Sequence, residues 1–169
     1  MIKLVITHMS LNSDVGKDAE DKIREWLDRP EFGFCFDRIP DQMTGQFGSK
    51  NICDFILFKS PEFYYIESKA TWEDSFKFSM LTKTQYNGLV DKDKIDHVHG
   101  IVTVLFASYK RAFWIPIESI KTLSDSGKKS INITKISKWN FDYTEIITIP
   151  NNRKKLLDYS EENYGVIFK

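Results

Sequence analysis

The stretch that decides the fold is Asn51-Ile-Cys-Asp-Phe-Ile-Leu-Phe58, followed by a Ser60-Pro61 turn and Phe63-Tyr-Tyr-Ile-Glu-Ser-Lys69. Both runs are rich in Ile, Phe, Tyr and Leu, and a proline-containing turn joins them, which predicts the two strands of an antiparallel hairpin. Three ionisable residues interrupt these otherwise apolar strands. Because burying a charge is costly unless the charge is paired or holds a metal, the interruptions indicate a chemical site.

The three ionisable residues are Asp54, Glu67 and Lys69. Side chains alternate along a strand, so Glu67 and Lys69 point to one face, and an antiparallel hairpin brings Asp54 alongside them. Two carboxylates supply hard oxygen ligands suited to Mg²⁺ or Mn²⁺, and an adjacent ammonium can orient a water or stabilise charge on a phosphate. The cluster therefore predicts phosphodiester hydrolysis. The alternative is a structural ion pair between Lys69 and Glu67 at a strand end.

A helix is predicted over residues 16–28, upstream of the hairpin. Its apolar stripe at helical spacing consists of Ala19, Ile23, Trp26 and Leu27. Glu20 lies beside this stripe, so its carboxylate can face the sheet. The alternative for Glu20 is an ordinary solvent-facing glutamate.

Asp54 and Glu67-Ser-Lys69 resemble the Asp…Glu-x-Lys signature of the PD-(D/E)xK nuclease superfamily, which has the restriction-endonuclease-like fold. A narrower resemblance, from about Gly16 to Ile117, is to the RecU-type Holliday junction resolvases of low-GC Gram-positive bacteria and their phages. The residues that carry it are, in chain order, Gly16, Glu20, Arg38, Pro40, Asp54, Glu67-Ser-Lys-Ala-Thr71, Ser75-Phe76, Gln85 and Phe113-Trp-Ile115.

The resemblance implies a reaction and a role for each site residue. It implies a Mg²⁺-dependent endodeoxyribonuclease, with Mn²⁺ as a substitute, that acts as a homodimer on branched DNA such as a four-way junction. Glu20, Asp54 and Glu67 would hold one or two metal ions. Lys69 would help to position the attacking water, and Gln85 would orient that water or the phosphate.

The resemblance also implies an α/β fold with a restriction-endonuclease-like core, in which helices flank a central mixed β-sheet in the order α-β-β-β-α-β. The sequence supplies candidates for each element. After the first helix we expect a strand at 32–37, the hairpin, a helix at 81–91, strands at 100–106 and 112–115, and a helix that begins at Pro116. Beyond residue 130 we expect a strand at 143–149, a basic helix at 152–159 and a closing strand at 164–168.

Two other functions remain open. The segment from Arg38 to Asn51 is shorter than the stalk that the resolvase family places at the junction centre, so a phage or restriction-type nuclease of other specificity is an alternative. A non-catalytic DNA-binding or assembly protein that keeps the fold is another. Intact Asp54, Glu67 and Lys69 count against this last alternative.

Length and composition agree with one soluble domain. The chain has 169 residues, which predicts a single nuclease domain over 1–169, with a core at about 16–120 and a C-terminal extension at 130–169 that either packs on the core or serves a partner. Cys35 and Cys53 are expected to be buried small hydrophobes in a reducing compartment. The first residues are too weakly apolar for a signal peptide, and no run suits a membrane helix, so a cytoplasmic location is expected.

Charge is distributed unevenly although the formal net charge is zero. Residues 1–100 carry 13 Lys and Arg against 17 Asp and Glu, whereas residues 101–169 carry 11 against 7. The formal charge is therefore minus four for the first part and plus four for the second. Basic residues of the second part are candidate phosphate contacts, with solvated lysines of no specific role as the alternative. The candidate DNA-binding residues are Arg38, Lys110, Arg111, Lys128, Lys129, Arg153, Lys154 and Lys155.

Aromatic and histidine residues offer two weaker patterns. Trp72, Tyr86 and Trp114 can stack on unpaired bases, although most aromatic side chains fill a core. His97 and His99 would share one strand face at a spacing that some metal sites use, but the sequence shows no third ligand near them, so histidines of a loop or of the core are the favoured interpretation. There is no phosphate-binding Gly-x-x-x-x-Gly-Lys loop and no dinucleotide glycine fingerprint, so ATP use has no support.

Overall fold

The computed structural model describes residues 15–17, 19–21, 23–24, 27–28, 33–40 and 51–148. Helical residues at 15–17, 19–21, 23–24 and 27 form the first helix. The strands are β1 (Cys35–Arg38), β2 (Phe55–Lys59), β3 (Glu62–Thr71), β4 (Ser75–Lys77), β5 (Val98–Phe106), β6 (Arg111–Pro116), β7 (Ser130–Asn132) and β8 (Thr144–Thr148). The later helices are α2 (Lys83–Asp93) and α3 (Ile117–Asp125), with 3₁₀ turns at Phe78–Met80, Ala107–Tyr109 and Ile133–Lys138.

The main sheet is mixed and has six strands in the order β1-β2-β3-β5-β6-β8. The central pair β3 and β5 is parallel, with Lys69 opposite Val104, and every other neighbouring pair in this sheet is antiparallel. Since parallel strands need a crossover, the chain leaves the end of β3, forms α2 across one face and returns to start β5. The two central strands are thereby covered on both faces.

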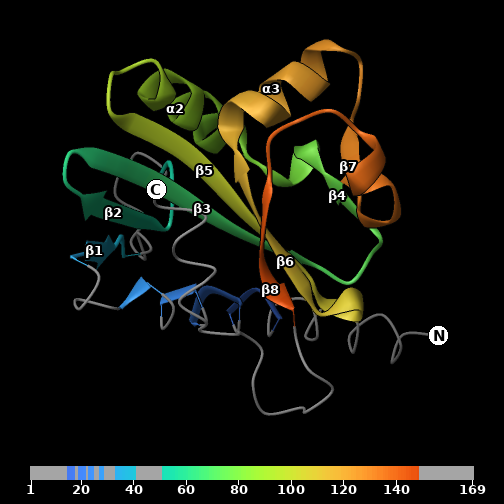
Figure 1. Cartoon of the computed structure of the whole chain (residues 1–169), viewed down its shortest axis with the longest axis horizontal. Helices are drawn as coiled ribbons and strands as arrows, with labels where there is room; N and C mark the ends of the chain where they lie inside the picture. The colour runs from blue at the N-terminus through green and yellow to red at the C-terminus, as the bar shows by residue number, and fades with distance from the viewer. Residues whose placement is uncertain are drawn as a thin grey trace, which may run out of the picture.

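One face of the sheet packs against the first helix. Ala19, Ile23 and Leu27 of this helix are buried together with Phe55 of β2 and Ile66 of β3. This contact confirms the apolar stripe at the described positions of the predicted helix. Figure 1 shows the blue first helix on the side of the sheet opposite α2 and α3.

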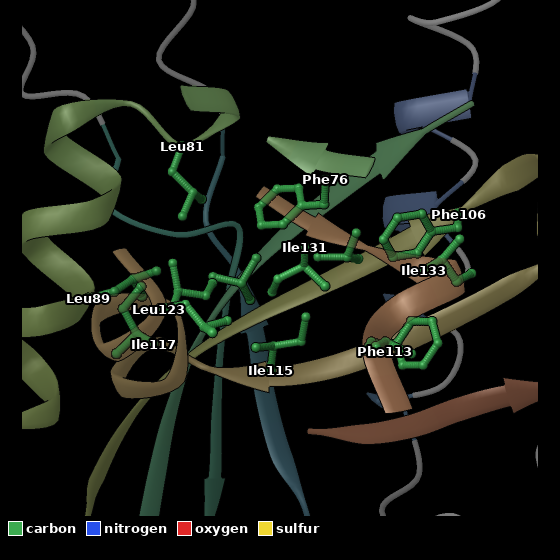
Figure 2. Packing of buried hydrophobic residues seen from close by; sticks show 14 of the residues in the cluster. Phe76, Leu81, Leu89, Phe106, Phe113, Ile115, Ile117, Leu123, Ile131 and Ile133 are labelled. Carbon is green, nitrogen blue, oxygen red and sulfur yellow. The ribbon is translucent and has the colours of Figure 1, made fainter. Parts of the chain in front are cut away.

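The other face packs against α2, α3 and the small strands. Figure 2 shows Leu89 of α2 and Ile117 of α3 pointing toward Ile115 of β6, with Phe76 of β4 and Ile131 of β7 beside them. These side chains are all fully buried. This cluster holds α2 close to β3. The candidate site lies where these two elements meet.

The chain after α3 supplies a small addition to the fold. β7 pairs antiparallel with β4, with Ile131 opposite Phe76, in a separate two-stranded sheet. Ile133 and Ile136 of the following 3₁₀ turn are buried in the same cluster as α2 and α3, and β8 closes the edge of the main sheet beside β6. The described part of the predicted extension, residues 130–148, therefore packs on the core.

The predicted fold class is confirmed: helices flank a central mixed sheet, and the core elements follow the order α-β-β-β-α-β. The observed ends of the elements differ from the predicted ends by a few residues. The first strand was expected at 32–37 but begins at Cys35, because Gly33 adopts a left-handed φ of 75° in a turn before it. The expected helix at 152–159 and strand at 164–168 lie outside the described residues.

One expectation is wrong. Cys35 is exposed, because it lies on the edge strand β1, whereas Cys53 is buried as expected. His97 has a left-handed φ of 61° and precedes β5, so it lies in a loop, whereas His99 lies in the strand. Among the described helices, none combines the length and the apolar character needed to span a membrane.

Candidate active site

Glu67 lies in the middle of β3 and is the centre of the candidate site. Its side chain is 1% exposed, although a carboxylate is among the groups least often buried. The carboxylate lies on the face of the sheet that α2 covers, since it accepts a hydrogen bond from Gln85 of that helix. Lys69 lies two residues further along β3 and shares this face, as strand alternation predicts.

Asp54 sits one residue before β2, beside the part of β3 that carries Glu67 and Lys69. Its backbone N–H donates to the Ile66 carbonyl at 3.0 Å, which continues the β2–β3 ladder. Its carboxylate Oδ2 accepts from the backbone N–H of Ser68 at 2.7 Å. The hairpin therefore brings Asp54 next to the Glu67-Ser-Lys69 segment, as the sequence predicts.

The two oxygens of the Glu67 carboxylate have different surroundings. Oε1 accepts from Lys69 Nζ at 2.6 Å and from Gln85 Nε2 at 2.5 Å. Oε2 is buried and has no hydrogen-bond partner among the residues that the structure describes. Burial, and next the nearby Asp54 carboxylate, raise the pKa of Glu67 to about 8, although Lys69 opposes the shift. The site thus contains a buried carboxylate that the protein alone stabilises poorly in its charged form.

Gln85 reaches Glu67 from the first turn of α2. The helix begins at a capping box, in which Thr82 Oγ1 accepts from the Gln85 backbone N–H at 3.2 Å and Gln85 Oε1 accepts from the Thr82 backbone N–H at 2.9 Å. The remaining polar atom of the Gln85 side chain, Nε2, donates to Glu67. One side chain thereby joins the start of α2 to the middle of β3.

Glu20 is more loosely connected with this group. Its carboxylate accepts from Arg38 Nη2 at 2.9 Å, and the first helix that carries it packs on the sheet face opposite α2. The Glu20 charge is the smallest of the causes that raise the pKa of Glu67, which shows that Glu20 lies within electrostatic range. Its role as a metal ligand stays a prediction.

The donor set of Asp54 and Glu67 fits a hard divalent cation. Within the described ranges, no group of three or more His, Cys, Asp or Glu side chains is arranged to hold a metal ion. The pair Asp54 and Glu67 nevertheless supplies carboxylate oxygens, and the bare Glu67 Oε2 is a buried acceptor that a cation would satisfy. Mg²⁺ is commonly held by one or two carboxylates plus waters and substrate phosphates, so two protein ligands are sufficient.

The candidate DNA-binding residues are spread over several elements. Arg38 pairs with Glu20, and Arg111 makes a two-pronged ion pair with Glu145 at 2.6 Å for each contact, which ties β6 to β8. Lys110 closes the 3₁₀ turn before β6 in a left-handed conformation. Lys128 lies 5.0 Å from the ring centre of Trp139. Lys129 precedes β7, and Arg153, Lys154 and Lys155 lie outside the described residues. DNA contact by any of these residues stays a prediction.

Sequence reasoning did not single out Thr82, although Thr82-x-x-Gln85 is a sequence signature of a capping box. It also did not find Glu62, whose two oxygens lie 2.9 Å from His97 Nδ1 and 2.6 Å from His99 Nε2. These pairs are 35 and 37 residues apart, and no local pattern indicates them.

The three aromatic residues expected to stack on bases have different surroundings in the structure. Trp72 is 41% exposed and Trp114 is buried. Tyr86 is partly buried against the hydrophobic cluster that contains Leu89 of α2 and Ile117 of α3. Trp114 therefore fills the core, and stacking on DNA by Trp72 stays a prediction.

Comparisons with known proteins place the chain in a family. The model of the family RecU, described as recombination protein U, matches residues 37–162, a range that contains Asp54, Glu67, Lys69 and Gln85 but not Glu20. Among solved structures, Hjc, a Holliday junction resolvase from the archaeal hyperthermophile Archaeoglobus fulgidus, is similar at 16% identity and a TM-score of 0.49, over 70% of this chain and 91% of that chain. A search of curated proteins found no match. Because the family model covers well over half of the chain, this protein belongs to the RecU family of recombination proteins.

Proposed function

We propose that Asp54, Glu67, Lys69 and Gln85 form the catalytic site of a Mg²⁺-dependent endodeoxyribonuclease that cuts four-way DNA junctions. The observation that carries this proposal is the bare Oε2 of Glu67. It is a buried carboxylate oxygen for which the described residues supply no hydrogen-bond donor, on a group whose charged form is disfavoured until a cation arrives. Such an arrangement costs stability, which is typical of a functional site.

In this proposal Asp54 and Glu67 hold the metal, and Glu20 joins them when its carboxylate leaves Arg38. Once bound, Mg²⁺ would polarise the scissile phosphate and make a water nucleophilic at neutral pH. Ser68 N–H holds the Asp54 carboxylate in place through its bond to Oδ2. Lys69 Nζ, already 2.6 Å from Glu67, supplies a positive charge for the phosphate or for the attacking water.

We further propose that the protein works as a homodimer in the cytoplasm, where its DNA substrate lies. A junction presents two equivalent strands that must both be cut, and a two-fold dimer places two copies of the site in the matching relation. The basic residues of the second part of the chain would contact phosphates. The alternatives are a phage or restriction-type nuclease of other specificity and a DNA-binding or assembly protein without activity.

Cleavage assays on single-site variants test the catalytic assignment. Asp54→Asn, Glu67→Gln and Lys69→Ala should each lower the rate of junction cleavage by at least about 100-fold, since each removes a charge from the reaction centre. Asp37→Asn is the matched control, because Asp37 is an exposed carboxylate on the neighbouring strand β1. Circular dichroism should show that all four variants keep their secondary structure.

Metal substitution completes the experiment. Mg²⁺ or Mn²⁺ should support cleavage, whereas Ca²⁺, which is larger and less strictly octahedral, should permit DNA binding without turnover. A chelator should stop the reaction and leave the fold intact. Parent-like cleavage by Asp54→Asn or Lys69→Ala would show that the site is elsewhere. Junction binding without cleavage under every metal would favour the non-catalytic alternative.

A further inference from the structure

We propose that Thr82 is a positioning residue of the nuclease: through its capping box with Gln85 it fixes which Glu67 oxygen is left open. Nothing in the Asp…Glu-x-Lys signature includes Thr82, and its side chain does not contact Glu67. The inference rests on the proposed function, because it concerns how the same site is held ready.

The Gln85 amide has one favourable orientation in this structure. Its Oε1 accepts the Thr82 backbone N–H at 2.9 Å, and its Nε2 donates to Glu67 Oε1. Rotating the amide by half a turn would place NH₂ against a backbone donor and a carbonyl oxygen against a carboxylate. Both contacts would become repulsive, so the backbone N–H of Thr82 determines which end of the amide faces Glu67.

The Thr82 side chain holds the geometry that makes this possible. Its Oγ1 accepts the Gln85 backbone N–H at 3.2 Å, and the Thr82 backbone is extended, with φ −65° and ψ 157°. The reciprocal pair fixes both the start of α2 and the first torsions of the Gln85 side chain. Leu81, buried immediately before the cap, anchors the same turn in the core.

The consequence for Glu67 is a choice between its two oxygens. Gln85 Nε2 and Lys69 Nζ both donate to Oε1, so the two donors crowd one oxygen. Oε2 has no hydrogen-bond partner within the described part of the chain and is the oxygen available to a cation. If the amide of Gln85 rotates freely, the carboxylate is no longer held in this orientation and Oε2 is not presented in a single direction.

The experiment compares Thr82→Val with Thr82→Ser, at the same helix cap, and with Asn132→Ala, at a different cap. Thr82→Val keeps the side-chain shape and removes the acceptor, whereas Thr82→Ser keeps the acceptor. Asn132→Ala is the matched control, because Asn132 caps the 3₁₀ turn Ile133–Lys138 by accepting from Thr134 N–H at 2.9 Å and has no contact with Gln85. With saturating Mg²⁺ and junction, Thr82→Val should lower kcat about 5-fold to 10-fold with little change in KM. Thr82→Ser and Asn132→Ala should retain the parent kcat.

A double-mutant cycle and a metal-free measurement separate positioning from loss of stability. In a Gln85→Met background, Thr82→Val should cause no further loss of kcat, since the two residues act as a unit. In metal-free protein, the side-chain NH₂ signals of Gln85 in a ¹⁵N–¹H spectrum should move toward free-amide positions in Thr82→Val and stay unchanged in Asn132→Ala.

Three results would overturn the inference: a parent-like kcat for Thr82→Val, an equal loss of kcat in Asn132→Ala, or fully multiplicative losses for Thr82→Val and Gln85→Met. Unchanged Gln85 NH₂ signals in Thr82→Val would overturn it as well. A wild-type protein that cuts no DNA would instead contradict the proposed function, and the spectra would still test the orientation of Gln85.

Discussion

At the scale of single residues, Glu67 is the position at which the site lowers the stability of the fold. A carboxylate with 1% exposure loses most of its hydration, and its hydrogen bonds from Lys69 and Gln85 satisfy one oxygen only. The raised pKa shows that these two donors do not compensate for burial and for the nearby Asp54 charge. The protein therefore gives up stability at this position, and cation binding would recover it.

The pH dependence of stability without metal follows from this shift. Glu67 titrates near 4.5 in the unfolded chain and at about 8 in the folded one, so between these values the folded state binds more protons. Its contribution is therefore fully present below about pH 4.5 and is lost as pH rises through about 8. Glu67→Gln cannot ionise and should remove this decline, which makes the variant more stable than the parent at pH 8 by on the order of 1–3 kcal/mol.

Urea denaturation in chelator at several pH values measures the effect. The matched comparison is Glu62→Gln, since Glu62 is a carboxylate on the same strand whose pKa is lowered, chiefly by its hydrogen bonds to His99 and His97. That variant should lose stability at neutral pH instead of gaining it. A Glu67→Gln variant with the parent's pH profile would show that Glu67 is not held in its neutral form.

At the scale of elements, the site depends on how closely α2 lies on the sheet. Two glycines mark that contact. A Cβ on Gly88 of α2 would meet Ile52 Cγ2 at 2.5 Å, and a Cβ on Gly100 of β5 would meet the Leu89 carbonyl oxygen and Ile117 Cγ2 at 2.7 Å each. Because α2 carries Gln85, this close approach is what lets a helix side chain reach Glu67 in β3.

Gly100→Ala should therefore destabilise the protein by about 1–3 kcal/mol, since the methyl group meets backbone that cannot give way as a flexible side chain would. Cleavage should fall along with stability, because α2 must shift. Gly16→Ala is the matched control: it lies in the first helix with nothing within 4 Å of an added Cβ, and alanine favours a helix more than glycine does. Thermal unfolding should show a lower Tm for Gly100→Ala only. An unchanged Tm for Gly100→Ala would mean that α2 does not lie as close to β5 as the structure shows.

At the scale of the whole molecule, different elements cover the two faces of the sheet. The first helix covers one face, and α2, α3 and the β4–β7 pair cover the other, where the ionisable cluster lies. The carboxylates lie in the first part of the sequence, whereas most of the candidate phosphate contacts lie in the second. This distribution suits a nuclease that holds metal at one place and DNA over a wider surface.

Binding measurements test the dimer and the substrate together. The Asp54→Asn protein should be a homodimer by sedimentation and should bind a four-way junction more tightly than a linear duplex at the same salt concentration. Affinity should fall steeply with salt, because each phosphate contact releases counterions, and Lys154→Ala with Lys155→Ala should make the slope shallower by about two units. Lys92→Ala, which removes one half-buried lysine in the last turn of α2, is the control for loss of a positive charge elsewhere in the chain. A monomer with equal affinity for junction and duplex would remove the resolvase assignment and leave the nuclease site standing.

Local pattern was sufficient for much of the fold and for part of the site. Strand periodicity predicted that Glu67 and Lys69 share a face, and the apolar hairpin predicted that Asp54 lies beside them. The core elements also followed from their apolar runs. The pattern failed at Cys35, because exposure depends on which strand becomes an edge. It also gave no sign that β4 and β7 pair.

By itself, then, the sequence determined the mixed α/β core, the convergence of Asp54, Glu67 and Lys69, and the chemistry that such residues permit. These features depend on short-range periodicity and on the ligand preferences of side chains. Only the tertiary structure decided that Gln85, 18 residues from Glu67, donates to the same oxygen as Lys69 and leaves Oε2 bare. The physical reason is that this contact requires α2 to pack closely on β3, and packing between distant segments depends on how the whole core fits together.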